Sequence, residues 1–204
     1  MYMNKKICVY AICKNERDKI ESWLGYVREA DYIVVVDTGS TDGTYEFLKS
    51  CKNIICEQKI FSHFRFDTAR NYALDLVPYD ADICLPLDID MILPKEWSAA
   101  IKRAWKKDLC LLQIPQYFKT NNRAGTWFAH CRNNVKWKYP VYEQLICKGR
   151  MGIVIDTVII HEFNPHGKSH SLYLPLAELG VAENPNDRYC KEVKKLITER
   201  EAGE

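Results

Sequence analysis

Apolar residues in the first half of the chain form runs short enough to be strands, and segments with helical spacing separate these runs. The runs at 7–13, 32–37 and 83–87 are almost continuously apolar, as is typical of parallel strands covered on both faces. Between the first two, residues 17–29 place apolar side chains three or four positions apart. This alternation predicts an α/β protein with a mostly parallel, Rossmann-like sheet and flanking helices.

The second half of the chain changes character. We expect a strand at 109–118, an aromatic-rich β-ribbon within 126–137 and a last strand at 153–161. Two polar helices are predicted at about 169–183 and 187–201, because a turn-forming Asn-Pro-Asn sequence separates them. The predicted fold therefore adds a small β-ribbon and C-terminal helices to the sheet.

Composition limits the class of protein. The chain has 204 residues, 47% apolar and 27% charged, as in an ordinary soluble domain. Its net charge of +2 provides no strong field for a nucleic acid. No apolar run approaches the ~20 residues that span a bilayer. We therefore expect no nucleic-acid partner and no transmembrane segment.

The nine cysteines show no C-x-x-C spacing, so the sequence indicates neither a zinc knuckle nor a redox pair. Cys8, Cys84 and Cys110 lie inside apolar runs, as buried free thiols do. We interpret the cysteines as reduced core residues, which predicts a cytoplasmic protein.

Two aspartates follow directly on the buried run at 83–87. Asp88 and Asp90 stand at the carboxyl end of this strand, where ligands bind in open α/β sheets. Paired carboxylates there can hold a hard divalent cation against a phosphate. Asp80 and Asp82 have the same spacing but precede the strand, where polar loop residues are ordinary. Position therefore predicts a metal-assisted enzyme with a phosphorylated donor, the alternative being that Asp90 merely begins a turn.

Asp37 also stands at a strand's carboxyl end, before the turn Thr-Gly-Ser-Thr-Asp-Gly-Thr at 38–44. Glycines let this backbone turn tightly, and a carboxylate here can accept hydrogen bonds from a base or a ribose. The turn lacks the G-x-G-x-x-G pattern, which argues against a nicotinamide site. The alternative is a capped turn with no ligand.

Four segments together resemble a family 2 glycosyltransferase of the GT-A fold. The resemblance covers about residues 5–165 and implies a GT-A nucleotide-sugar-binding catalytic domain at 1–165, with a C-terminal helical extension at 166–204. The segments are Ala11-Ile12-Cys13-Lys14-Asn15-Glu16, Val36-Asp37-Thr38-Gly39-Ser40-Thr41-Asp42-Gly43-Thr44, Ala69-Arg70-Asn71 and Leu87-Asp88-Ile89-Asp90.

This resemblance implies a metal-dependent, inverting transfer of a hexosyl or N-acetylhexosaminyl group. The donor would be a nucleotide-sugar, commonly a UDP-sugar, and the acceptor a glycan, a lipid-linked sugar or a protein. By similarity, the nucleotide and its ribose or diphosphate lie near Ala11, Asn15, Glu16, Asp37, Arg70 and Asp88.

The resemblance also implies the metal ligands. Asp90 would ligate Mn²⁺ or Mg²⁺, and His161, which ends the run at 153–161, can complete the site. Imidazole is an unusual ligand for Mg²⁺, so a histidine here favours Mn²⁺. The alternative for His161 is a histidine with its hydrogen bonds satisfied at a strand end.

Inverting transfer requires a base that removes the acceptor's proton. Members of the family often carry a His-Glu pair after an aromatic-rich ribbon. Here Glu143 matches the glutamate and is the candidate base, while Tyr142 replaces the histidine. This replacement leaves the acceptor type and the activity open, and Glu143 can also be read as a surface-loop residue.

Two other classes of function stay open. A nucleotidyltransferase would normally show a Gly-rich phosphate loop near its N-terminus, and none is visible. A non-catalytic nucleotide-sugar-binding module, or a truncated relative, agrees with the short C-terminus and the missing histidine. Tyr117, Trp127 and Trp137 are either stacking surfaces for sugar rings or core residues.

Overall fold

The computed structural model describes residues 5–119, 123–154, 156–161 and 170–201. Its strands are β1 (Ile7–Cys13), β2 (Tyr32–Asp37), β3 (Ile55–Gln58), β4 (Ile83–Pro86), β5 (Met91–Ile92), β6 (Leu109–Phe118), β7 (Arg123–Cys131), β8 (Val135–Lys138), β9 (Gln144–Cys147), β10 (Arg150–Ile153) and β11 (Ile159–His161). Its helices are α1 (Arg17–Val27), α2 (Thr44–Ser50), α3 (Phe66–Asp75), α4 (Trp97–Ala104), α5 (His170–Glu183) and α6 (Arg188–Glu201).

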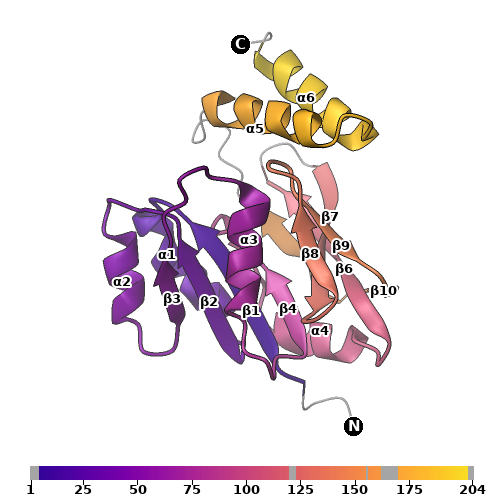
Figure 1. The fold of residues 1–204 in the computed structure, drawn as a ribbon. Helices are drawn as coiled ribbons and strands as arrows, with labels where there is room; N and C mark the ends of the chain where they lie inside the picture. The colour runs from indigo at the N-terminus through magenta and orange to yellow at the C-terminus, as the bar shows by residue number, and fades with distance from the viewer. Residues whose placement is uncertain (1–4, 120–122, 155, 162–169, 202–204) are drawn as a thin grey trace.

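The main sheet confirms the predicted α/β architecture. Its order is β3-β2-β1-β4-β7-β6-β11-β5, with β10 also paired to β6. The pairs among β1, β2, β3 and β4 are parallel, whereas β7 runs antiparallel to both of its neighbours. The carboxyl ends of β1, β2 and β4 therefore meet at one edge of the sheet (Figure 1).

Alternation along β1 assigns its side chains to two cores. Ile7 and Val9 belong to the core that also contains Trp23 of α1 and Ile101 of α4. The intervening Tyr10 belongs to the opposite core, beside residues of α3 and β8. Successive strand side chains point to opposite faces, so an uninterrupted apolar run is what a sheet covered on both faces requires.

The two C-terminal helices lie together beyond one end of the sheet (Figure 1). They share a small core with the loop before β9, because Leu176 and Ala177 of α5 and Val193 and Ile197 of α6 cluster with Val141. No helix among the described residues is both long and apolar enough to cross a bilayer. The predicted domain boundary between 165 and 166 falls outside the described residues.

The prediction of one strand at 153–161 is wrong. β10 and β11 both pair with β6, but the first ends opposite Gln113 and the second begins opposite Gln116. The Gln113 carbonyl accepts a hydrogen bond from the Val154 amide at 2.9 Å, so the backbone groups of Gln113 point towards the segment between β10 and β11. Backbone groups two positions apart in a strand point the same way, so those of Pro115 also point there, and proline has no amide hydrogen to donate. The ladder is interrupted there.

The ribbon expected within 126–137 divides between two sheets. β7 joins the main sheet between β4 and β6, whereas β8 pairs with β9 as a separate antiparallel ribbon. The small β-ribbon is therefore present, but half of it comes from residues after the predicted segment.

The expectation that all cysteines are reduced is wrong for one pair. Cys110 of β6 and Cys147 of β9 form a disulfide, with their Cα atoms 6.6 Å apart, and the other seven cysteines are free. The two residues are 37 positions apart, so no local spacing indicated that β6 and β9 bring them together.

His130 makes the stability of the fold depend on pH. Its ring is fully buried and lies 2.8 Å from the Tyr10 hydroxyl. Burial lowers its pKa from 6.5 to about 4. As pH falls, His130 takes up a proton at a higher pH in the unfolded chain than in the folded protein. The stability that the neutral buried ring contributes is therefore present above about pH 6.5 and is lost as the pH falls towards 4. We expect the free energy of unfolding to fall by about 2 kcal/mol between pH 7 and pH 5 from this group.

Denaturant unfolding at the two pH values measures the effect. His130→Gln should flatten the pH dependence, whereas His63→Gln, at an exposed position, should leave it unchanged. Equal pH dependence in the wild type and His130→Gln would contradict the assignment.

Candidate functional site

The turn after β2 is organised around Asp37, which is fully buried. Its Oδ1 accepts hydrogen bonds from the amides of Gly39 at 3.0 Å and Ser40 at 2.9 Å, and from Gln58 Nε2 at 3.0 Å. Burial by itself would raise the pKa of Asp37, but the hydrogen bonds from Ser40, Gln58 and Gly39 outweigh it and the pKa is lowered. One carboxylate oxygen therefore holds the turn. The hydrogen bond from Gln58 of β3 was not predicted from the sequence.

The loop after β1 is joined to this turn. The Asn15 amide donates to Ser40 Oγ at 2.8 Å, and Asn15 Oδ1 accepts from the Thr41 amide at 2.8 Å. Asn15 has a positive φ of 55°, which asparagine tolerates better than most residues. Glu16 precedes α1, and its amide donates to Thr44 Oγ1 at 3.0 Å. The two motif loops thus form one surface at the edge of the sheet.

Ala11 lies within β1 and is fully buried in the core. Its side chain packs inside the sheet, whereas Asn15 and Glu16 lie beyond the carboxyl end of the strand. A ligand at this edge can therefore meet Asn15 and Glu16, while Ala11 supports the strand beneath them.

A buried arginine joins two of the predicted motifs. Arg70 of α3 donates from Nη2 to Asp88 Oδ1 at 2.6 Å and from Nε to Glu143 Oε1 at 2.5 Å. Its side chain is 4% exposed, against 27% for Asp88 and 10% for Glu143. The guanidinium also lies over the Trp137 ring, 5.1 Å from its centroid. The structure thus brings together three predicted site residues from distant parts of the chain.

The electrostatics of this cluster keep Arg70 charged, and one of its donors is not used within the described structure. Burial would lower the pKa of Arg70, but the charges of Asp88 and Glu143 dominate and raise it. Arg70 Nη1 is buried and has no hydrogen-bond partner among the described residues. Two carboxylates accept hydrogen bonds from this one guanidinium. A buried donor without a partner among the described residues suits a phosphate oxygen, and the Asp-x-Asp carboxylates beside it suit a divalent cation.

The backbone brings His161 next to the Asp-x-Asp segment. β5 begins at Met91, directly after Asp90, and pairs antiparallel with β11 so that His161 is opposite Met91. The Trp23 indole, donating to the Asp88 carbonyl at 3.0 Å, fixes the backbone of the same segment from α1. Sheet register therefore places His161 beside the predicted metal ligands.

An aromatic wall beside Glu143 was not predicted. Tyr173 of α5 stacks on Phe66 with ring centroids 5.9 Å apart and lies 6.1 Å from the Tyr142 ring. Burial first, and then Tyr142, Glu143, Asp88 and Asp90, raise the pKa of Tyr173 to about 12. The contact with Tyr142, the neighbour of Glu143 in the chain, places the phenol near the motif cluster. The sequence offered no signal for it, because Tyr173 is remote from every motif.

The aromatic residues singled out from sequence have different roles. Trp137 is 5% exposed and its Nε1 donates to the Tyr10 hydroxyl at 2.8 Å, so it is a core residue beneath Arg70. Trp127 is half-buried, packs against the main core and donates to the Pro86 carbonyl at 2.5 Å. Tyr117 is the most exposed of the three, at 40%.

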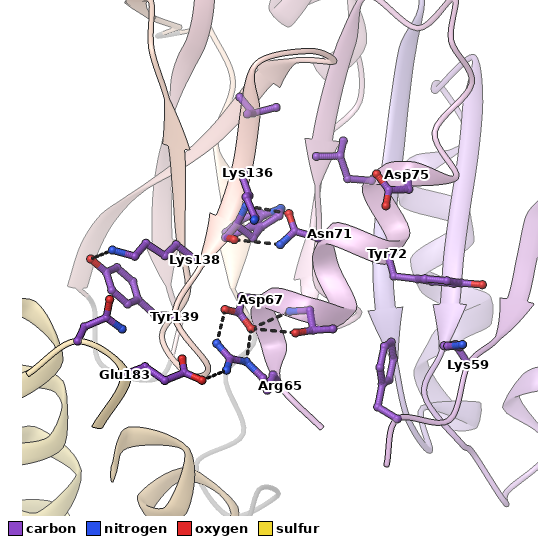
Figure 2. Close-up of a pocket in the computed structure, with 16 residues that line it drawn as sticks. Lys59, Arg65, Asp67, Asn71, Tyr72, Asp75, Lys136, Lys138, Tyr139 and Glu183 are labelled. Atoms are coloured by element: carbon purple, nitrogen blue, oxygen red, sulfur yellow. Dashed lines mark hydrogen bonds and ion pairs between the residues drawn. The ribbon is translucent and has the colours of Figure 1, made fainter. Parts of the chain in front are cut away.

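A separate cavity lies apart from the carboxylates of the candidate site. A cavity of about 970 Å³ between the outer face of α3 and β8 is lined by Asn71, Tyr72 and Lys136, among others, but not by Arg70, Asp88 or Glu143. Figure 2 shows Arg65 at its edge, between Asp67 and Glu183. Asn71 bonds to the Trp137 backbone at 2.9 and 3.0 Å, which ties α3 to the ribbon. We place the candidate site at the strand ends, where the unsatisfied donor and the carboxylates converge.

Comparison with known proteins adds the family. A model described as glycosyl transferase family 2 matches residues 8–164. A search of curated proteins finds no match.

Solved structures share the fold at low identity. S. aureus TarS 1–349 in complex with UDP-GlcNAc superposes with a TM-score of 0.60 at 14% identity, covering 95% of this chain and 71% of that chain. A longer S. aureus TarS chain gives 0.56 at 16% identity, covering 92% and 42%. HddC from Yersinia pseudotuberculosis gives 0.51 at 10% identity, covering 84% and 98%.

The fold and the family rest on different findings. The structural likenesses confirm the GT-A fold, although identities this low establish only the fold. The family model matches more than half of the chain, and its first matched residues lie in β1. The chain therefore belongs to glycosyl transferase family 2.

Proposed function

We propose that the protein transfers a hexosyl or N-acetylhexosaminyl group from a UDP-sugar to a hydroxyl group of an acceptor, with inversion and with a divalent metal. The observation that carries the proposal is the Arg70 cluster, in which one buried guanidinium joins Asp88 to Glu143. The cluster joins residues that the family resemblance assigns to donor and acceptor chemistry. A sugar nucleotide bound at this edge would meet both.

The nucleotide would lie along the surface formed by the loops after β1 and β2. Asn15 and Glu16 would face it, and Asp37, whose Oδ2 accepts a hydrogen bond from the Cys13 thiol at 3.7 Å, would hold the turn beside the base and ribose. Arg70 Nη1, the unsatisfied donor, suits a diphosphate oxygen. The TarS structure solved with UDP-GlcNAc supports a uridine nucleotide and an N-acetylhexosamine as the first donor to test.

The residues fit a divalent cation. Asp88 and Asp90 supply carboxylate oxygens, and a cation held by two carboxylates is normally completed by the substrate's phosphates. His161, opposite Met91 in the sheet register, is the proposed third ligand, and a histidine ligand would favour Mn²⁺ over Mg²⁺. The metal would neutralise the charge that develops on the leaving diphosphate.

Glu143 is proposed as the base. Its carboxylate would take the proton of the acceptor hydroxyl as that oxygen attacks the anomeric carbon opposite the departing UDP. The salt bridge to Arg70 at 2.5 Å holds the carboxylate in place. Tyr142, which has a strained φ of 48°, and Tyr173 stand beside Glu143 and would stack on an acceptor sugar.

We expect UDP to bind only with Mn²⁺ and Asp90→Asn to weaken that binding at least about tenfold, or ~1.4 kcal/mol. Calorimetric titration with Mn²⁺ and with EDTA measures both effects. Asp80→Asn is the matched control. Asp80 and Asp82 have the same spacing as Asp88 and Asp90, but Asp80 accepts hydrogen bonds from Lys6 and Tyr32. Equal binding by wild type and Asp90→Asn would remove Asp90 from the metal site.

The second candidate is a nucleotide-sugar-binding module without turnover. Tyr142 in place of the family's histidine favours it. Metal-dependent UDP binding without any UDP release from UDP-sugars, across glycan, lipid-linked and protein acceptors, would identify it. We also propose a cytoplasmic location; the seven free cysteines agree with a reducing compartment, whereas the disulfide by itself does not.

A further inference from the structure

Three cysteine side chains converge in the structure, and we call them the cysteine centre: Cys110, Cys131 and Cys147. Their sulfur atoms all lie within 4.8 Å of one another. Cys110 and Cys147 form the disulfide, and Cys131 Sγ lies 3.0 Å from Cys110 Sγ. A disulfide needs two cysteines, so the bridge does not account for the third sulfur.

The cysteine centre is separate from the candidate donor site. Cys131 is in register with Ile83, the first residue of β4, whereas Asp88 follows the other end of that strand. The chain passes closely around the sulfurs, because a Cβ at Gly149 would lie 2.5 Å from Cys110 Cβ. Cys110 is buried and its two partners are half-buried, so the centre is partly accessible to solvent.

We propose that the reduced cysteine centre binds a thiophilic divalent cation, with Zn²⁺ as its representative. Three thiolates at about 2.3 Å from zinc place their sulfurs about 3.8 Å apart, which the observed convergence nearly provides. Three protein ligands leave the fourth position to water.

The disulfide and the metal site use the same sulfurs and are alternative states. A dithiol reductant gives two electrons and two protons to the Cys110–Cys147 bridge, producing two thiols while the reductant becomes a disulfide. Binding of the cation then releases the protons of the three thiols. Neither step requires another reactant.

Either state anchors the ribbon that carries the candidate base. β9 begins at Gln144, directly after Glu143, and ends at Cys147. Cys110 and Cys131 belong to β6 and β7 of the main sheet. A metal at the cysteine centre would therefore tie the ribbon to the sheet in the reduced protein, as the disulfide does in the oxidised one.

The test is a Zn²⁺ titration of the metal-free chain, anaerobic and reduced with a phosphine, against a chromophoric chelator. Thiol counting should give nine thiols after reduction and seven before it. We expect one equivalent of Zn²⁺ to bind the reduced protein, with Cys131→Ser lowering the affinity at least about tenfold. The oxidised protein should lose this site.

Cys51→Ser is the matched control, because Cys51 and Cys131 are both half-buried free thiols. Each donates to a backbone carbonyl, Cys51 to that of Phe47 and Cys131 to that of Asn133. It should bind Zn²⁺ as the wild type does. Circular dichroism of the metal-free variants establishes that they fold, and Cys147→Ser replaces Cys131→Ser if the latter does not. Absence of stoichiometric Zn²⁺ binding, or equal affinity in the folded serine variants, would overturn the proposal.

Discussion

Arg70→Met is expected to lower the free energy of unfolding by about 3–5 kcal/mol and to abolish transfer. The substitution keeps an unbranched apolar stem over Trp137 but removes the charge between Asp88 and Glu143. Glu143, which is 10% exposed, then loses its charged partner in a poorly solvated position, and losing a buried partner costs more than the pair contributes. Chemical denaturation measures the stability, and UDP release from a UDP-sugar measures the activity.

Arg65→Met is the matched control for stability. Arg65 also sits between two carboxylates, those of Asp67 and Glu183, but its side chain is 23% exposed and that of Glu183 is 40% exposed. Solvent screens such pairs, so we expect a loss of about 1 kcal/mol or less. If the two variants lost equal stability, the Arg70 cluster would be no more desolvated than an ordinary surface pair.

Glu143→Gln is expected to reduce kcat by two to four orders of magnitude, in the range about 10²–10⁴, while UDP affinity changes little. Glutamine keeps the shape and can still accept the hydrogen bond from Arg70, but it cannot take a proton from the acceptor. The split between lost turnover and retained binding separates a base from a residue that only supports the fold. Steady-state kinetics and UDP calorimetry on the same preparation measure both.

Glu183→Gln provides the control for this substitution. Glu183 likewise accepts a hydrogen bond from an arginine, Arg65, at 2.5 Å, but lies in α5 beside the cavity on the outer face of α3. It should retain wild-type turnover. Full activity in Glu143→Gln would assign the proton to another group and leave Glu143 as a partner of Arg70.

Local pattern was sufficient for most of the fold. The strands at 7–13, 32–37 and 109–118 were predicted with the bounds that the structure has. Continuous apolar runs and helical spacing are properties of neighbouring residues, so they can be read without knowing what packs where. The break between β10 and β11 could not be read in this way, because it depends on which side of β6 Pro115 presents to its neighbour.

The candidate site likewise has a part that the sequence predicted and a part that depends on tertiary contacts. By itself the sequence determined the family and the edge of the sheet at which Asp37, Asp88 and Asp90 stand, because motif spacing and strand order are properties of the chain. Only the tertiary structure decided that Arg70 reaches Glu143, 73 positions away, and that α5 adds Tyr173. The cysteine centre likewise needed three strands to meet. Contacts between distant segments depend on packing, which no local spacing encodes.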